Sequence, residues 1–231
     1  AVIRGIQGMG TAMIYSTNIA ILVENSEPKQ KGKYLGIVTS ANYLGLSAGP
    51  VLGGIINYYF QWKGIFIVSA FISAIALFLS LKGTSSKRKD AKITKNDFVM
   101  LFKNKKYLTT NLATFINFGA TFAISYMIST YLQEIKGVNS KVAGLILVSA
   151  PIIQTIISPI VGKLSDKFSP FKLSALGMAA CSVAVLSFAF IDDKTSLVVI
   201  IILLALSGLG SGLFSAPNTN AVMSIVDSNN Y

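Results

Sequence analysis

Charged side chains in or beside apolar sequence are the first candidates for chemistry in this chain. Arg4 directly precedes the apolar run 5–23, and Asp166 follows the run 142–162. A charge in apolar surroundings is costly and usually functional. Asp and Glu are absent from the runs themselves, although Glu24 and Glu134 stand close to the ends of two of them. The acidic groups that could titrate therefore lie at or beyond the ends of the apolar runs and not inside them.

Other reactive groups are scarce. The chain has no histidine and a single cysteine, Cys181, so neither an imidazole relay, a histidine metal site nor an internal disulfide is expected. No nucleophile with a base, no acid pair and no metal-ligand cluster is evident. We therefore expect no enzyme activity, no metal and no cofactor.

A glycine pattern in the second apolar run is the most informative motif. Gly45, Gly49 and Gly53 recur every four residues, so they share one face of a helix. Glycine lets two membrane helices approach closely, and Pro50 removes a backbone donor and predicts a bend. The whole pattern is Gly36, Gly45, Gly49, Pro50, Gly53 and Gly54.

The composition is that of a membrane protein. Of the 231 residues, 52% are hydrophobic and 13% charged, against about 25% charged in ordinary soluble domains. A helix of about 20 apolar residues spans a bilayer. Seven uncharged runs of 18 to 32 residues predict an all-α membrane protein with seven transmembrane helices: 5–23, 34–62, 64–81, 107–133, 142–162, 173–191 and 195–226.

The basic residues predict the topology. If the first run ends inside the cell, the connections 24–33, 82–106 and 163–172 are cytoplasmic and hold 15 Lys and Arg, against 4 on the other side. This is a strong positive-inside bias. It accounts for the net charge of +11 without nucleic acid, so we expect a multi-pass protein of the cell (plasma) membrane whose surroundings are lipid.

An internal repeat relates the first and last runs. Residues 8–18 align without gaps with residues 210–220, at an offset of 202, and share a Gly-x-Gly and a Thr-Asn pair. Two six-helix halves of this size would place the last run six helices after the first.

Three motifs together resemble those of the major facilitator superfamily, specifically its drug–proton antiporters. The glycine pattern resembles the antiporter signature of their fifth helix. The residues Arg4, Gln7, Gly8 and Gly10 are similar to their fourth-helix motif, in which the resemblance assigns Arg4 a role in proton coupling. The residues Gly162, Leu164, Asp166 and Lys167 are similar to their cytoplasmic loop motif, although Ser169 and Pro170 stand where the family prefers glycine and basic residues. An acid at a helix end can engage backbone donors or a basic partner in one state only.

The resemblance implies a partial bundle, a fragment matching helices four to ten of twelve. The chain begins at Ala1 in apolar sequence without an initiator Met. Residues 1–82 would be the last three helices of the N-terminal six-helix bundle, 83–106 a basic cytoplasmic linker, and 107–231 the first four helices of the C-terminal bundle. Fourteen-helix exporters insert two helices between the halves, and the single linker favours twelve.

The resemblance also implies a substrate site between the halves, near the membrane midplane. Helices four, seven and ten line that cavity, and their polar and aromatic residues are candidate contacts: Asn18, Asn117, Tyr126, Asn218 and Asn220. Gln154 is a weaker candidate. Asparagines in membrane helices also simply join helices to one another.

The leading hypothesis is proton-driven efflux of lipophilic or amphipathic small molecules by alternating access, by a transporter that works as a monomer when full length. Protons would be the coupling ion, and the carboxylate that carries them would lie outside these 231 residues. A permease of the same superfamily for a polar metabolite, such as a sugar or organic anion, is the alternative. A membrane receptor or scaffold without transport is the third reading.

Overall fold

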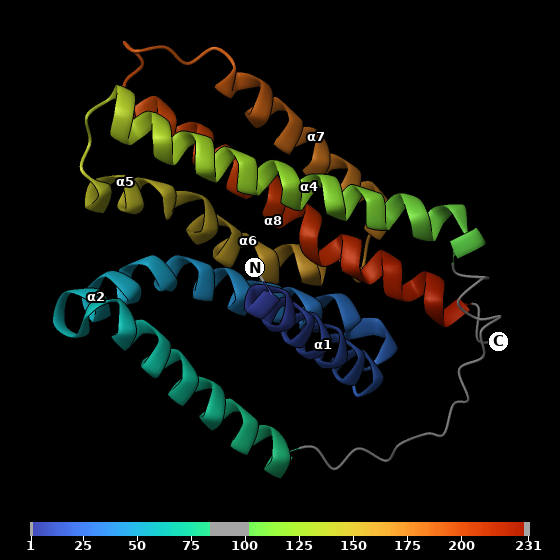
Figure 1. Ribbon diagram of the computed structural model, residues 1–231. Helices are drawn as coiled ribbons and strands as arrows, with labels where there is room; N and C mark the ends of the chain where they lie inside the picture. The colour runs from blue at the N-terminus through green and yellow to red at the C-terminus, as the bar shows by residue number, and fades with distance from the viewer. Residues whose placement is uncertain (1, 84–101, 229–231) are drawn as a thin grey trace.

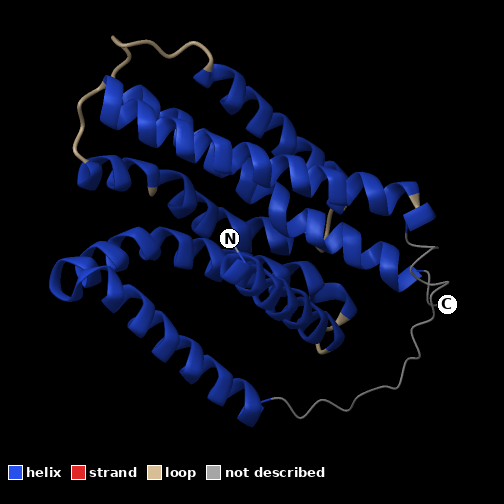
Figure 2. Cartoon of the chain, in the orientation of Figure 1, coloured by secondary structure: helices blue, strands red, loops and turns tan. Residues whose placement is uncertain are grey.

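The computed structural model describes residues 2–83 and 102–228, and it is helical throughout, with no strand in those ranges (Figures 1 and 2). This confirms the predicted all-α membrane fold. A short 3₁₀ turn at Pro28–Gln30 and a π-helical turn at Tyr131–Ile135 complete the elements. The helices are α1 (Val2–Glu24), α2 (Lys31–Gly83), α4 (Lys105–Thr130), α5 (Ser140–Leu147), α6 (Ser149–Ser165), α7 (Pro170–Phe188) and α8 (Leu197–Ser228).

The long helices match the predicted runs. Within the described residues, six segments are long and apolar enough to cross a membrane: Gly5–Glu24, Tyr59–Lys82, Lys105–Ile135, Lys141–Ser165, Pro170–Phe188 and Leu197–Ile225. The remaining predicted run, 34–62, is not among these six but is helical as the first part of α2. The predicted linker 83–106 lies mostly outside the described residues.

The break within α2 falls at Gln61. The sequence predicts a bend at Pro50, yet the chain is helical on both sides of that residue, and the non-helical dihedrals are those of Gln61, with φ 57° and ψ −176°. The second part of α2 turns back from there, away from α6 (Figure 1). The uncharged runs 34–62 and 64–81 thus form two helices joined by a tight turn.

Replacing Gln61 with glycine should stabilise this turn. A positive φ combined with an extended ψ is nearly confined to glycine and costs other residues about 1–3 kcal/mol. Glycine adds unfolded-state entropy worth about 0.5–1 kcal/mol, so Gln61→Gly should raise stability by about 1 kcal/mol. Thermal unfolding of the purified protein measures this, with Gln133→Gly, in the helical turn that ends α4, expected to be destabilising. An unchanged or lower Tm for Gln61→Gly would contradict the turn geometry.

The C-terminal helices pack around α8. Helix α8 packs against α7 and also against α6 (Figure 1). Its glycines permit this, because a Cβ at Gly210 would lie 2.6 Å from the backbone nitrogen of Cys181 on α7. Such a contact is possible only without a side chain, so Gly210 of the repeat is a packing residue.

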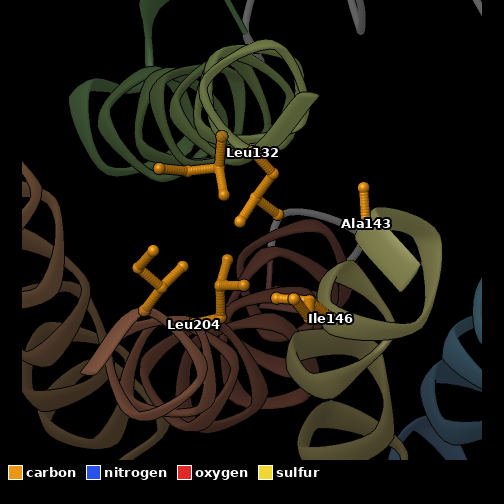
Figure 3. Close-up of a cluster of buried hydrophobic side chains, with 6 residues drawn as sticks. Leu132, Ala143, Ile146 and Leu204 are labelled. Carbon is orange, nitrogen blue, oxygen red and sulfur yellow. The ribbon is translucent and has the colours of Figure 1, made fainter. Parts of the chain in front are cut away.

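A buried cluster fastens α8 to the end of α4 and to α5. Leu132, Ala143 and Leu204 are at most 2% exposed. Together with Ile146 they belong to one cluster of buried side chains (Figure 3). Gly137, with φ 64°, turns the chain from α4 into α5, and the Asn139 side chain caps α5 by accepting from the backbone N–H of Val142 at 2.9 Å. Apolar burial and caps therefore fix these three helices relative to one another.

Candidate functional site

A cavity of about 600 Å³ lies between four helices from both parts of the chain. α1 and α2 form one wall, and α4 and α8 form the other. On α2 the lining residues Thr39, Asn42, Tyr43 and Leu46 recur at helical spacing and so share one face. They stand about 12–22 Å along the helix from its start at Lys31.

Two hydrogen bonds organise this cavity. The Asn218 amide donates to the Thr114 hydroxyl at 2.7 Å, which joins α8 to α4. The hydroxyls of Tyr43 and Ser215 lie 2.7 Å apart, which joins α2 to α8 across the two walls. The first bond lies within the C-terminal segment, whereas the second connects the two segments.

Of the predicted substrate residues, the structure places Asn218 in this cavity and the other four outside its lining. Asn220 is two residues further along α8, about 200° around the helix, and donates to the Ser165 hydroxyl of α6 at 3.1 Å. Asn117 is buried, with its amide 3.5 Å from the Cys181 sulfur. Helical rotation thus turns these two amides toward neighbouring helices.

The other two predicted residues are exposed. Asn18, the repeat counterpart of Asn220, lies on an exposed part of α1. Tyr126 is 73% exposed and stands about 18 Å along α4 from Thr114, too far to reach the cavity. Gln154 is buried within α6 and does not line the cavity.

The start of α2 meets the end of α6 in a contact between backbones. A Cβ at Gly36 would lie 2.5 Å from the Ser158 carbonyl oxygen, and one at Gly162 would lie 2.6 Å from the Gly36 Cα. The Ser40 hydroxyl extends the contact by donating to the Thr155 carbonyl oxygen at 2.6 Å. One glycine of the antiporter pattern therefore packs against the glycine of the loop motif.

Asp166 caps α2 from the end of α6. Its two carboxylate oxygens accept the backbone N–H groups of Gly32 at 2.6 Å and Lys33 at 2.8 Å. The first N–H groups of a helix have no partner within it, and the positive end of the helix dipole favours an anion there. The loop motif thus joins the two parts of the chain on the side predicted to be cytoplasmic. Leu164 and Lys167 of the same motif are exposed.

The remaining motif glycines face open space. A Cβ at Gly45, Gly49 or Gly53 would meet no described atom within 4 Å, and the same is true of Gly8 and Gly10. The predicted close packing at these positions is therefore not made by the described residues. The side chains of Arg4 and Pro50 and the surroundings of Gly54 lie outside the described part, and the roles predicted for Gln7 and Arg4 stay predictions.

The whole chain, residues 1–231, matches the family model described as Major Facilitator Superfamily. The chain belongs to this superfamily.

Three curated relatives show which members of the superfamily the chain resembles. A riboflavin transporter, RibZ, of Clostridioides difficile is 24% identical over 96% of this chain and 60% of its own length. The multidrug resistance protein Stp of Mycobacterium tuberculosis is 23% identical over 96% of this chain and 52% of its own length. A PmrA homologue of Lactococcus lactis, named a multi-drug resistance efflux pump, is 24% identical over 94% of this chain and 55% of its own length. The chain therefore spans about half the length of the curated relatives it matches.

Sequence reasoning missed most residues of the cavity wall. Tyr43 and Ser215 are uncharged residue types that occur in any membrane helix, so their identity carried no signal. Helical spacing could have found them, because Ser215, Asn218 and Val222 recur every three or four residues on α8. The repeat offers a second signal, since Ser16 and Asn218 occupy equivalent positions and both line the cavity.

Proposed function

We propose that this superfamily member is helices four to ten of a twelve-helix transporter that exports amphipathic small molecules in exchange for protons by alternating access. The observation that carries the proposal is the cavity shared by the segments 1–82 and 107–231. A site between two segments can face either side when they rock against each other. The relatives named as multidrug resistance and efflux proteins support the choice of substrate class.

The junction of α2 and α6 supports the alternating part of the mechanism. Its principal polar contact is one carboxylate on two N–H groups, and the backbones of the two helices meet beside it at Gly36 and Gly162. We propose that this contact separates and forms again as the two segments rock against each other. We propose that it closes the cavity on the cytoplasmic side, where 24–33, 82–106 and 163–172 lie.

The proposal also includes the oligomeric state and the location of the protein. It would be a monomeric transporter of the plasma membrane and not an enzyme. Arg4 would adjust the pKa of a carboxylate on another helix of the full-length protein. The glycines Gly45, Gly49 and Gly53 would meet a helix in another state of the protein or from another part of it.

A permease for a polar metabolite is the second candidate function. The observation in its favour is the relative named as a riboflavin transporter, which aligns with almost the whole chain. A cavity with amide and hydroxyl groups as well as aromatic rings suits a polar ring system.

Flux through the full-length protein in proteoliposomes separates the two functions. Phenanthridinone, a flat and uncharged amphipathic molecule, added to vesicles with an imposed pH gradient should be transported and should dissipate that gradient, as read by an enclosed pH dye. Empty vesicles serve as the control. Riboflavin flux without any change in the gradient would favour the permease, and absence of flux for both compounds would contradict transport.

A further inference from the structure

The described cavity wall carries no charge, and it combines aromatic rings with amide and hydroxyl groups. All 17 lining residues are uncharged. Four are aromatic, namely Tyr15, Tyr43, Phe118 and Phe214, and three are asparagines, namely Asn42, Asn111 and Asn218. Aromatic faces receive flat apolar bodies, while amides and hydroxyls both donate and accept hydrogen bonds.

The bond between Tyr43 and Ser215 is the point at which a ligand would engage both walls. Tyr43 is 6% exposed and its hydroxyl reaches across from α2 to α8. Each hydroxyl can donate one hydrogen bond and accept others. A ligand edge with one donor and one acceptor can therefore replace this bond without leaving either hydroxyl unpaired.

The exchange favours neutral ligands. Replacing the hydrogen bond between the two hydroxyls by two hydrogen bonds to a neutral ligand costs little free energy, because neutral hydrogen bonds contribute similar amounts. A buried ion needs a counter-charge or a dense set of polar partners, and this wall offers neutral dipoles and rings.

We propose that the cavity binds uncharged, flat molecules that carry a hydrogen-bond donor and acceptor on one edge, and that this edge replaces the Tyr43–Ser215 bond. The inference rests on the proposed transport function, because the cavity is the same. It deepens that function by naming the substrate class and the two hydroxyls that select it.

Four probes built on one three-ring frame test the substrate class. Phenanthridinone is neutral, with the N–H and the carbonyl of its lactam side by side on one edge. On the same frame, phenanthrene has no polar edge, 5-methylphenanthridinium is a cation and phenanthridine-6-carboxylate is an anion. Their affinities for the purified full-length protein in detergent are measured by probe fluorescence and by thermal stabilisation. Phenanthridinone should bind about tenfold more tightly than either ion and about threefold or more tightly than phenanthrene. An ion that binds as tightly as phenanthridinone would overturn the proposal.

Two variants test the hydroxyls. Tyr43→Phe and Ser215→Ala should each weaken phenanthridinone binding about threefold to tenfold while phenanthrene binding stays unchanged. Tyr34→Phe, which removes a hydroxyl from an exposed position outside the cavity, should bind all four probes as wild type does. Equal losses for phenanthridinone and phenanthrene would indicate a merely structural role, and no loss for either variant would also overturn the proposal.

The assay separates this inference from the proposed function, because binding is measured without flux. Phenanthridinone selectivity in a protein that moves no phenanthridinone across vesicles would refute transport and leave the binding inference standing. Flux of 5-methylphenanthridinium with no preference for phenanthridinone would do the reverse.

Discussion

Gly162→Ala is expected to reduce transport by at least about tenfold. The new methyl group would lie 2.6 Å from the Gly36 Cα and 2.9 Å from the Gly36 nitrogen, far inside van der Waals contact. Backbone atoms cannot rotate away as a side chain can, so α2 and α6 must separate, and overpacking of this kind costs about 1–3 kcal/mol. A cost of about 1.4 kcal/mol already changes the ratio of closed to open protein tenfold.

Gly119→Ala is the matched control for this variant. It lies in α4, where a Cβ would meet no described atom within 4 Å, and alanine favours a helix over glycine by about 1 kcal/mol. Its transport rate in proteoliposomes should equal that of wild type. A Gly162→Ala protein that folds and transports at the wild-type rate would show that the α2–α6 contact is not needed.

Asp166→Asn has the second large expected effect. An asparagine amide offers one acceptor oxygen to the Gly32 and Lys33 N–H groups that the carboxylate accepts together. Its NH₂ group would face the other donor, and a hydrogen bond to a charged group contributes about 1.5–3 kcal/mol. The closed cytoplasmic contact should therefore lose at least about tenfold in population, and the transport rate should fall by a similar factor.

Accessibility of the α2 start reports this change directly. In an Asp166→Asn background, a cysteine at Ser40 should react faster with a water-soluble maleimide than in wild type. Asp193→Asn removes the same charge from an exposed outer position and should change neither the labelling nor the transport rate. Unchanged labelling in the Asp166 variant would show that the carboxylate takes no part in the proposed closure.

The fold could be predicted because it depends on properties carried by long stretches of sequence. Uncharged runs such as 107–133 and 142–162 are too apolar to be loops, and the structure has helices there. The placement of the lysines predicted the topology, and the glycine pattern together with two other motifs indicated the family. These signals are averages over many residues, so errors at single positions do not alter them.

The site was harder to predict because it depends on rotation about each helix axis. Asn218 and Asn220 look equivalent in sequence, yet one lines the cavity and the other binds Ser165. Gly36 and Gly162 lie in separate motifs, and only the packing of α2 on α6 shows that they touch. A partner across a helix interface is not encoded in the spacing within either helix.

The central claim is that the α2–α6 junction opens and closes around the cavity during transport. Spin labels at cysteines replacing Lys29 and Lys167, both exposed near this junction, measure it by pulsed dipolar spectroscopy in a Cys181→Ser background of the full-length protein. We predict two distance populations, the shorter matching the structure, whose ratio shifts when pH or phenanthridinone concentration changes. A single distance that stays constant under all these conditions would contradict the account.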